Sequence, residues 1–311
     1  MDLMIAGLAA AGIRLSISIA FAALGETVSQ RAGVMNVGLE GIMLFSAFLA
    51  AAGAVYSGSP WGGVALAILG GLLLAAVHGW VSIYLCANQI VSGLALVFLG
   101  AGLSGVGYRL TIGGAPVTIP SFPAVNFGPL REIPFIGPVF FSHTLLVYIA
   151  IALAIVLYLA LPRTGWGLEL RAAGENPHAA DAAGINVNRY RLMAVLFGGA
   201  MAGLGGAFLV LAQVNAFVEG MVAGRGFIAI ACVVFGGWNP LGVLIACMGF
   251  GLADALQIRL QTWYPGVPYQ FFVMMPYGVA LVALVIFASR SFGPAALGLP
   301  FRSLRARRSA S

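Results

Sequence analysis

Residues 192–213, the stretch that decides the fold, read LMAVLFGGAMAGLGGAFLVLAQ and carry no charged side chain. An α-helix needs about 20 mostly apolar residues to cross the hydrocarbon of a bilayer, so this run predicts a transmembrane helix. Its small residues recur every four positions, which places them on adjacent faces of one helix. Helices in membranes pack through small residues, and we therefore expect close backbone contacts at Gly198, Gly199, Ala202, Gly203 and Gly206.

The same apolar signature recurs along the chain. Eight runs, including 192–213, are long enough to cross a bilayer. A ninth, near 222–238, is shorter and flanked by glycine, which fits either a tilted span or a broken, re-entrant helix. The sequence predicts an all-α integral membrane protein, one transmembrane helix bundle over residues 1–311, with eight to ten transmembrane helices and nine as the working number. The other long runs lie near 3–24, 34–56, 62–86, 89–110, 142–161, 239–258 and 271–289.

The composition excludes several classes of protein. Hydrophobic residues make up 61% of the chain and charged residues only 8%, too few to cover a soluble protein of this size. All fifteen basic residues are arginine, so a lysine-containing phosphate loop is excluded and any ATP hydrolysis belongs to another chain. The cysteines, Cys86, Cys232 and Cys247, lack metal-ligand spacing, and we expect no metal or cofactor in this chain.

The arginines predict the orientation. Segments rich in arginine face the cytoplasm, which applies here to residues 162–191 and to the basic tail 290–311. Counting crossings back from these segments places residues 25–33 inside, and a proline-rich lid at 111–141 and the N-terminus outside. Because the positive charge gathers between apolar runs, it does not indicate nucleic-acid binding. Nine of the fifteen arginines lie in the two cytoplasmic segments: Arg163, Arg171, Arg189, Arg191, Arg290, Arg302, Arg305, Arg307 and Arg308.

A short helix is expected inside segment 162–191. Asn176 suits an N-cap, Pro177 the first helical position and Gly184 the position after the end. Two turns, about 10 Å at 1.5 Å per residue, are marginal in water and offer little apolar surface. We therefore expect this helix to dock in a groove on a partner protein; the alternative is an ordinary surface helix, with His178 solvated rather than bound to metal.

Charged side chains also occur in or beside the apolar runs. A charge at the bilayer centre costs about 2.5–3.5 kcal/mol on insertion scales, so Glu40 should face the bundle interior, pair with a partner such as Arg31, or lie near the interface. We interpret Arg14, Asp254 and Arg259 as structural.

Polar groups inside spans are candidates to meet a neutral, hydrogen-bonding solute, although helix–helix hydrogen bonds use the same residue types. The candidate translocation path comprises Asn36, Glu40, Asn88, Gln89, Ser92, Gln213, Asn215 and Asn239. Candidates to stack on a planar ring are Phe98, Phe217, Phe227 and Trp238.

Several stretches of the sequence resemble one known family. They are QRAGVMNVGLEGIML (30–44), NQIVSG (88–93), GENP (174–177), AAGI (182–185), GRGFIA (224–229) and FGGWNPLG (235–242). Together they are similar to the permease subunits of nucleoside and simple-sugar ABC importers, and LEGIM at 39–43 looks closest to the shorter of the two nucleoside permeases. Val97 stands where the family often has asparagine, which leaves the solute open.

The resemblance implies a type II ABC importer fold in the bacterial cytoplasmic membrane. Its partners are a separate ATPase that binds ATP and Mg, a second homologous permease that makes a heterodimer, and an extracytoplasmic solute-binding lipoprotein. The implied solute is a nucleoside or purine-type compound, with a simple sugar or riboflavin-like vitamin as alternatives. The helix that couples to the ATPase falls among Gly174, Glu175, Asn176, Pro177, His178, Ala179, Ala180, Asp181, Ala183 and Gly184.

On the residues alone, two other classes stay open. An ion-coupled secondary transporter or facilitator would use intramembrane acids such as Glu40 and Asp254 to carry protons. An intramembrane enzyme is disfavoured because the chain has no paired His-Glu zinc motif and no Ser or Asp in a recognisable catalytic setting.

Overall fold

The computed structural model describes residues 2–113, 118–264, 266–287 and 293–302. Within these ranges every regular element is a helix, apart from an isolated bridge between Ala124 and Thr144. The all-α prediction is confirmed. The predicted basic tail is described only in part, and Arg290, Arg305, Arg307 and Arg308 lie outside the described residues.

Seven helices in the described ranges are long and apolar enough to cross a membrane. Two of them end in a π-helical stretch, η1 after α3 and η3 after α9. The helices are α1 (Asp2–Arg31), α2 (Leu39–Ser57), α3 (Pro60–Gly79) with η1 (Trp80–Tyr84), α4 (Gln89–Thr111), α6 (Leu145–Arg163), α9 (Val187–Phe208) with η3 (Leu209–Val214), and α11 (Pro240–Trp263).

Two shorter helices occupy the remaining predicted spans. α10 (Arg225–Phe235) has 11 residues, about 16 Å at 1.5 Å per residue, so the broken-helix interpretation of 222–238 applies. α13 (Met275–Phe287) has 13 residues. The other elements are η2 (Gly128–Glu132), α5 (Ile136–Phe140), α7 (Gly165–Glu175), α8 (Pro177–Ala182) and α12 (Tyr269–Val273).

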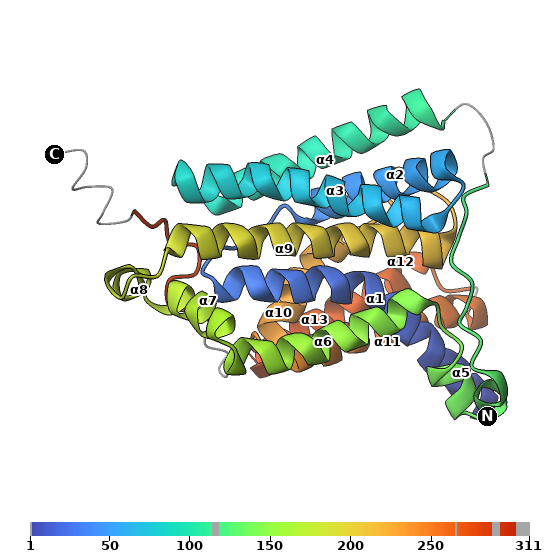
Figure 1. The fold of residues 1–311 in the computed structure, drawn as a ribbon. Helices are drawn as coiled ribbons and strands as arrows, with labels where there is room; N and C mark the ends of the chain where they lie inside the picture. Colours follow the sequence, from blue (N-terminus) through green and yellow to red (C-terminus); the bar gives the residue numbers. More distant parts are fainter. Residues whose placement is uncertain (1, 114–117, 265, 288–292, 303–311) are drawn as a thin grey trace.

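α9 runs through the middle of the bundle, and its glycines lie against the backbones of three other helices (Figure 1). A methyl group on Gly199 or Gly203 would overlap α3, and one on Gly206 would overlap α2 at the Met43 carbonyl. Gly198 faces Gly25 of α1. The small residues of α9 therefore set how closely α1, α2 and α3 approach it.

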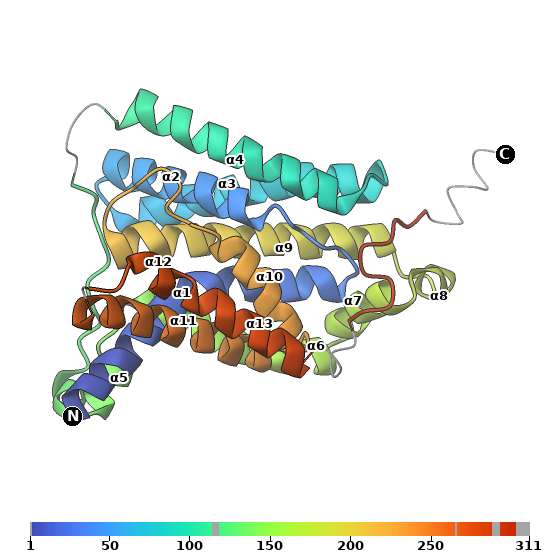
Figure 2. The same cartoon turned by 180° about the vertical axis from the view of Figure 1, so that it is seen from behind.

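The bundle has two ends, which we name by the short helices on them. The α8 end carries α7, α8 and residues 293–302, and the α5 end carries α5 and the start of α1 (Figures 1 and 2). At the α5 end, the described part of segment 111–141 folds back on the bundle. There the Phe122 N–H donates to the Leu211 carbonyl at 2.8 Å, and the Phe122 ring packs edge-on against Trp61.

Candidate functional site

The connection between α1 and α2, residues 32–38, is non-helical yet lies inside the bundle. Non-helical backbone at membrane depth has to find its hydrogen-bond partners within the protein. Glu26 of α1 accepts from the Asn36 N–H at 2.9 Å, and Gln89 of α4 accepts from the Met35 N–H at 2.8 Å. Two of the predicted path residues, Asn36 and Gln89, therefore serve to hold this connection in place.

His78 completes the support of this connection from α3. Its Nε2 lies 3.2 Å from the Met35 carbonyl and its Nδ1 lies 3.1 Å from the Ser92 hydroxyl. The imidazole is fully buried. Ser92, a predicted path residue, thus contacts another side chain of the protein.

Sequence reasoning missed Glu26, Gln30 and His78 as key residues of this region. Glu26 and Gln30 are four residues apart and share a hydrogen bond of 2.9 Å, and Gln30 accepts from the Trp238 indole N–H at 2.8 Å. The signal was present, because Glu26 and Gln30 fall on one face of a helix and His78 is the only charged or strongly polar side chain in its apolar run.

Glu40, at the start of α2, binds the N-terminus of α10. Its two carboxylate oxygens accept from the Gly224 N–H at 2.7 Å and the Gly226 N–H at 2.8 Å. A carboxylate is stabilising at this position because the first N–H groups of a helix are unpaired and carry partial positive charge. A Cβ on Gly226 would overlap the Glu40 backbone, so glycine is required there.

Of the three alternatives for Glu40, contact with the bundle interior is the one observed, and no pair with Arg31 occurs among the described residues. The Arg31 Nε donates instead to the Trp238 carbonyl at 3.1 Å, at the α8 end. α2 begins only after the non-helical connection has turned back into the bundle, which separates Glu40 from the end of α1.

A cavity of about 190 Å³ lies beside the start of α10. Arg225 and Asp254 both line it, together with Gln257 and Tyr277. The Arg225 Nε is buried and has no hydrogen-bond partner among the described residues. Charged side chains at membrane depth commonly mark solute or ion pathways, and Arg225 keeps this Nε free although its Nη1 donates to the Met221 and Val222 carbonyls at 3.1 and 3.4 Å.

The remaining predicted path residues, like those described above, do not line this cavity. Asn88 and Asn239 are N-caps of α4 and α11, and their Oδ1 atoms accept from the first N–H groups of those helices. The Oε1 of Gln213 is buried without a partner, and Asn215 is exposed at φ 58°. Among the aromatic candidates, Phe217 and Trp238 are buried in protein, whereas Phe98 is 76% exposed and Phe227 43%.

At the α8 end, α8 has the geometry expected from the sequence. The Asn176 Oδ1 accepts from the Ala179 N–H at 3.0 Å, Pro177 occupies the first turn, and Gly184 has φ 93°. His178 and Ala179 are exposed, whereas Ala180 is 4% exposed and faces the protein's own core. Next to α8 lies a cavity of about 440 Å³, whose lining includes Gly184 and Tyr190.

Residues 293–302, which we call the C-terminal strap, cross this end of the bundle. The Ala296 N–H donates to the Gly174 carbonyl at 2.9 Å, and the Gly298 N–H donates to the Gly33 carbonyl at 3.1 Å. Phe301 packs edge-on against His178 with ring centroids 5.1 Å apart. The strap thus joins α7 and α8 to the turn that begins the α1–α2 connection.

Arg191 of α9 holds the strap through hydrogen bonds of its buried guanidinium group. Only 1% of its surface is exposed, and its guanidinium donates to the Ala32 carbonyl at 3.2 Å and the Leu299 carbonyl at 3.0 Å. It also lies 5.9 Å from the centre of the Phe301 ring.

Within the described ranges, no three His, Cys, Asp or Glu side chains gather as a metal site would require.

Comparison with known proteins gives one consistent family. Residues 8–296 match the family described as branched-chain amino acid transport system / permease component. The chain is 40% identical over 261 residues to the putative glucose ABC transporter permease protein TsgC13 of Haloferax volcanii, which covers 83% of this chain and 78% of that protein. No protein of solved structure matches.

Two bacterial proteins match almost end to end. The guanosine ABC transporter permease protein NupQ of Bacillus subtilis is 36% identical over 90% of this chain and 91% of its own length. The nucleoside ABC transporter permease protein NupC of Lactococcus lactis is also 36% identical, over 90% and 92%. Each bacterium has a second, more distant match with a name of the same kind. The guanosine ABC transporter permease protein NupP of Bacillus subtilis is 31% identical over 47% of this chain, and the nucleoside ABC transporter permease protein NupB of Lactococcus lactis is 30% identical over 46%.

Proposed function

The chain belongs to the family described as branched-chain amino acid transport system / permease component, which makes it a membrane-spanning permease subunit of an ABC importer, and we propose that its solute is a nucleoside. The single observation that supports the solute is the end-to-end similarity to the guanosine and nucleoside permeases. The similarity to a putative glucose permease supports a sugar as the second candidate. A nucleoside contains a sugar, so both candidates present hydroxyl groups to the same kind of site.

Uptake measurements separate the two solutes. The complete importer in membrane vesicles, supplied with ATP, should take up labelled guanosine, and unlabelled adenosine or uridine should compete better than ribose, glucose, riboflavin or a free purine base. The matched control is the same importer with an ATPase subunit that cannot hydrolyse ATP, which should take up nothing. Glucose uptake that guanosine does not inhibit would overturn the nucleoside assignment in favour of the sugar.

As an ABC permease, the subunit works with an ATPase and a second permease, and we propose specific positions for its partners. The ATPase docks on α8, because its outer residues are exposed and the adjacent cavity of about 440 Å³ offers a groove. The α8 end is then cytoplasmic, in keeping with its arginines. A solute-binding lipoprotein docks at the opposite, α5 end. The second permease differs in sequence from this one, as the paired matches within single bacteria suggest.

The geometry supports a continuous route from α8 to the cavity inside the bundle. Gly174, at the end of α7, packs so closely on the turn 31–33 that a Cβ there would overlap the Arg31 carbonyl. The connection 34–38 follows, and then Glu40, which binds the first turn of α10. A displacement of α7 and α8 by the ATPase would therefore move α10 relative to Asp254, which lies across the cavity on α11.

Two glycines of the same helix test this route. Gly174→Ala would push α7 away from the turn 31–33, whereas Gly165→Ala meets nothing within 4 Å. We expect Gly174→Ala to lower guanosine uptake about tenfold while the ATPase still binds and hydrolyses ATP, and Gly165→Ala to behave as the unchanged protein. Equal uptake by the two variants, at equal amounts of folded protein, would refute the route.

A second pair tests the docking surface itself. Ala179→Trp adds bulk to the exposed side of α8, and we expect it to abolish co-purification with the ATPase without lowering the melting temperature of the permease. Ala180→Trp places the same bulk in the core beside Phe301, and it should lower the melting temperature. Normal ATPase association in Ala179→Trp contradicts the assignment.

A further inference from the structure

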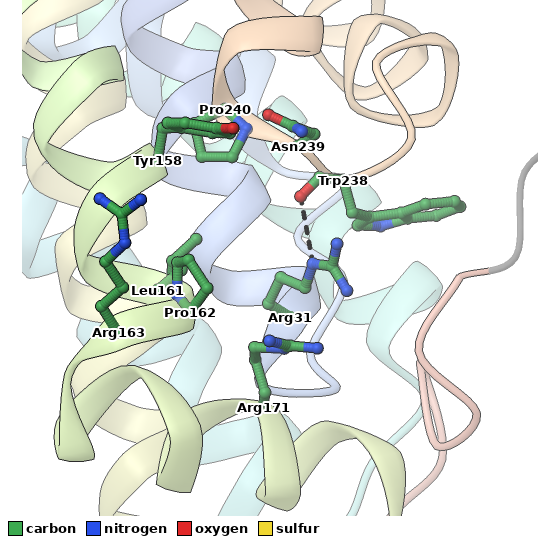
Figure 3. Close-up of a pocket in the computed structure, with 9 residues that line it drawn as sticks. All are labelled: Arg31, Tyr158, Leu161, Pro162, Arg163, Arg171, Trp238, Asn239 and Pro240. Carbon is green, nitrogen blue, oxygen red and sulfur yellow. Dashed lines mark hydrogen bonds between the residues drawn. The ribbon is translucent and has the colours of Figure 1, made fainter.

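A cavity of about 290 Å³ opens at the α8 end where α1, α6, α7 and the start of α11 meet (Figure 3). Three arginines from three different helices line it, Arg31, Arg163 and Arg171, and no acidic residue does. In Figure 3 the Arg31 and Arg171 guanidinium groups lie one above the other, while Arg163 stands on the far side of Leu161 and Pro162. The cavity is thus a cationic site built from separate parts of the chain.

Most of the hydrogen-bonding capacity of these arginines is unused. The Arg171 Nε is buried without any partner, and Arg31 uses its Nε for the Trp238 carbonyl. Arg163 makes no hydrogen bond or ion pair with any residue that the structure describes. Arg31 is attracted by the negative charge of Glu175 and repelled by the positive charge of Arg171. The Glu175 carboxylate, however, accepts a hydrogen bond from the Ala295 N–H at 3.2 Å. A buried donor without an acceptor, such as the Arg171 Nε, is costly, which favours an anion in the cavity.

The position of the cavity indicates where such an anion comes from. It lies where the spans of α1 and α6 end, at Arg31 and Arg163, and where that of α11 begins, at Pro240. These helix ends mark the depth of the bilayer's polar interface. Directly before Arg163, α6 exposes an apolar surface made of Ile155, Val156, Tyr158 and Leu159. This arrangement matches an anionic lipid. Its acyl chains would lie on the apolar surface of α6, and its head group would reach the cationic cavity at the depth of the interface.

We propose that this cavity binds the phosphate of an anionic phospholipid. The guanidinium groups of Arg31 and Arg171 donate to the phosphate oxygens, Arg163 adds positive charge from beyond Leu161 and Pro162, and the acyl chains lie along α6. Arginine suits this role because its planar donors match the geometry of phosphate oxygens. The lipid would neutralise the charge between α7 and the end of α1, which are the two parts whose contact at Gly174 links α8 to the bundle.

Lipid binding to the purified full-length permease in detergent tests the proposal. The probes are dioleoylphosphatidylglycerol, dioleoylphosphatidylcholine with the same chains but no net charge, and inorganic phosphate, with bound lipid counted by native mass spectrometry. We expect the phosphatidylglycerol to bind and the other two to bind much more weakly. Arg163→Gln and Arg171→Gln should each weaken phosphatidylglycerol binding about fivefold, as expected for the loss of one cation near a membrane surface.

The matched control is Arg189→Gln, which removes the same charge from the same end of the bundle but outside this cavity. It should bind phosphatidylglycerol like the unchanged protein. Equal weakening in all three variants overturns the proposal, because the attraction would then be a general effect of net charge. Inorganic phosphate that binds as tightly as the lipid, or loss of the lipid when the ATPase subunit binds, would overturn the lipid assignment in favour of a soluble anion or an acidic side chain of the ATPase. Arg163 is exposed and unpaired within the described structure, so its variant should fold normally.

Discussion

α9 with its continuation η3 and α4 have the same mean hydropathy, yet they occupy opposite places in the bundle. In their most apolar stretches, 78% of the residues of α9–η3 are buried inside the protein against 22% for α4. Hydropathy therefore predicts that a segment enters the membrane but does not predict which segment lies at the centre. Lipid chains are as apolar as leucine, so apolar character gives a helix no preference for protein over lipid.

The two helices are also held in different ways. α9 is held by backbone contact, because its glycines let α1, α2 and α3 approach it directly. α4 makes such backbone contact on its face toward α2, where Gly93 and Gly100 lie against Gly38 and Gly41. It also has polar contacts near its two ends, Gln89 with the Met35 N–H at one and Arg109 with Glu219 at the other. Larger residues should therefore damage α9 on several faces but α4 on the face that meets α2, and changes of polarity should loosen the ends of α4.

The largest effect is expected from Gly206→Leu in α9. The new side chain would overlap the Met43 carbonyl of α2, and a backbone atom cannot move aside as a side chain does. We expect no folded protein to be recovered, because the strain exceeds the roughly 1–3 kcal/mol of ordinary overpacking. Size-exclusion chromatography of a fluorescent fusion measures the recovery. Gly102→Leu in α4 meets nothing within 4 Å and is the control; if the two variants are recovered equally, the difference between the helices does not come from backbone contact.

A second, smaller effect compares two phenylalanines. Phe208 of α9 is fully buried, and Phe98 of α4 is 76% exposed. In a membrane the cavity is the main cost of Phe→Ala, about 2 kcal/mol for roughly 100 Å³ at about 24 cal/mol per Å³. Thermal melting in detergent should show a clear loss of stability for Phe208→Ala and almost none for Phe98→Ala. A comparable loss at Phe98 would mean that α4 is covered by protein rather than lipid.

Gln89→Leu should produce the third effect, localised at the start of α4. The change leaves the Met35 N–H without its acceptor, and hydrogen bonds of this kind in membrane proteins contribute about 1 kcal/mol. Hydrogen exchange of the connection 32–38 should speed up while α9 stays protected. Gln257→Leu, in the cavity beside α10, is a control with the same loss of an amide. Unchanged exchange at 32–38 would show that the hydrogen bonds from His78 and Glu26 are enough to hold this connection without Gln89.

The smallest effect is expected at the exposed Arg109–Glu219 pair. The hydrogen bond from Arg109 lowers the pKa of Glu219 below its usual value, so the pair is present above that usual value, about 4.3, and is lost as the pH falls through the lowered pKa. Spin labels at Leu110→Cys and Val218→Cys should report an increased distance once the pH is below the lowered pKa but a constant one between pH 6 and 8. Arg109→Gln should abolish this pH dependence, and a pH dependence that persists in that variant would assign it to another group.

The sequence was a good guide to features that depend on neighbouring residues. Long apolar runs predicted the seven long helices, and the order Asn176, Pro177, Gly184 predicted the limits of α8, because caps and breaks act within one turn. It was a poor guide to contacts between distant parts of the chain. Glu40 binds amides 184 and 186 residues away, and no local pattern specifies that.

The same reason explains two other differences. α1 continues past the predicted end at residue 24 to Arg31, because Glu26 and Gln30, which look like loop residues, find partners in residues 32–38 and in Trp238. Six of the eight predicted path residues are caps or internal hydrogen-bonding groups, since polar side chains in a bundle serve the protein itself as readily as a solute. Arg225 was missed because its unpaired Nε becomes apparent only when the surroundings are known.

The C-terminal strap has a consequence for biosynthesis. Ribosomes make a chain from the N-terminus, so residues 31–33 and Gly174 leave the ribosome long before residues 293–302, which bridge them. The surface around α8 is therefore complete only after residues 293–302 have been translated. A chain truncated after α11 would insert most of its helices and still lack the strap contacts at Gly33, Gly174 and His178. With the ATPase on the proposed α8 surface, only chains that already contain the strap would present that surface in full.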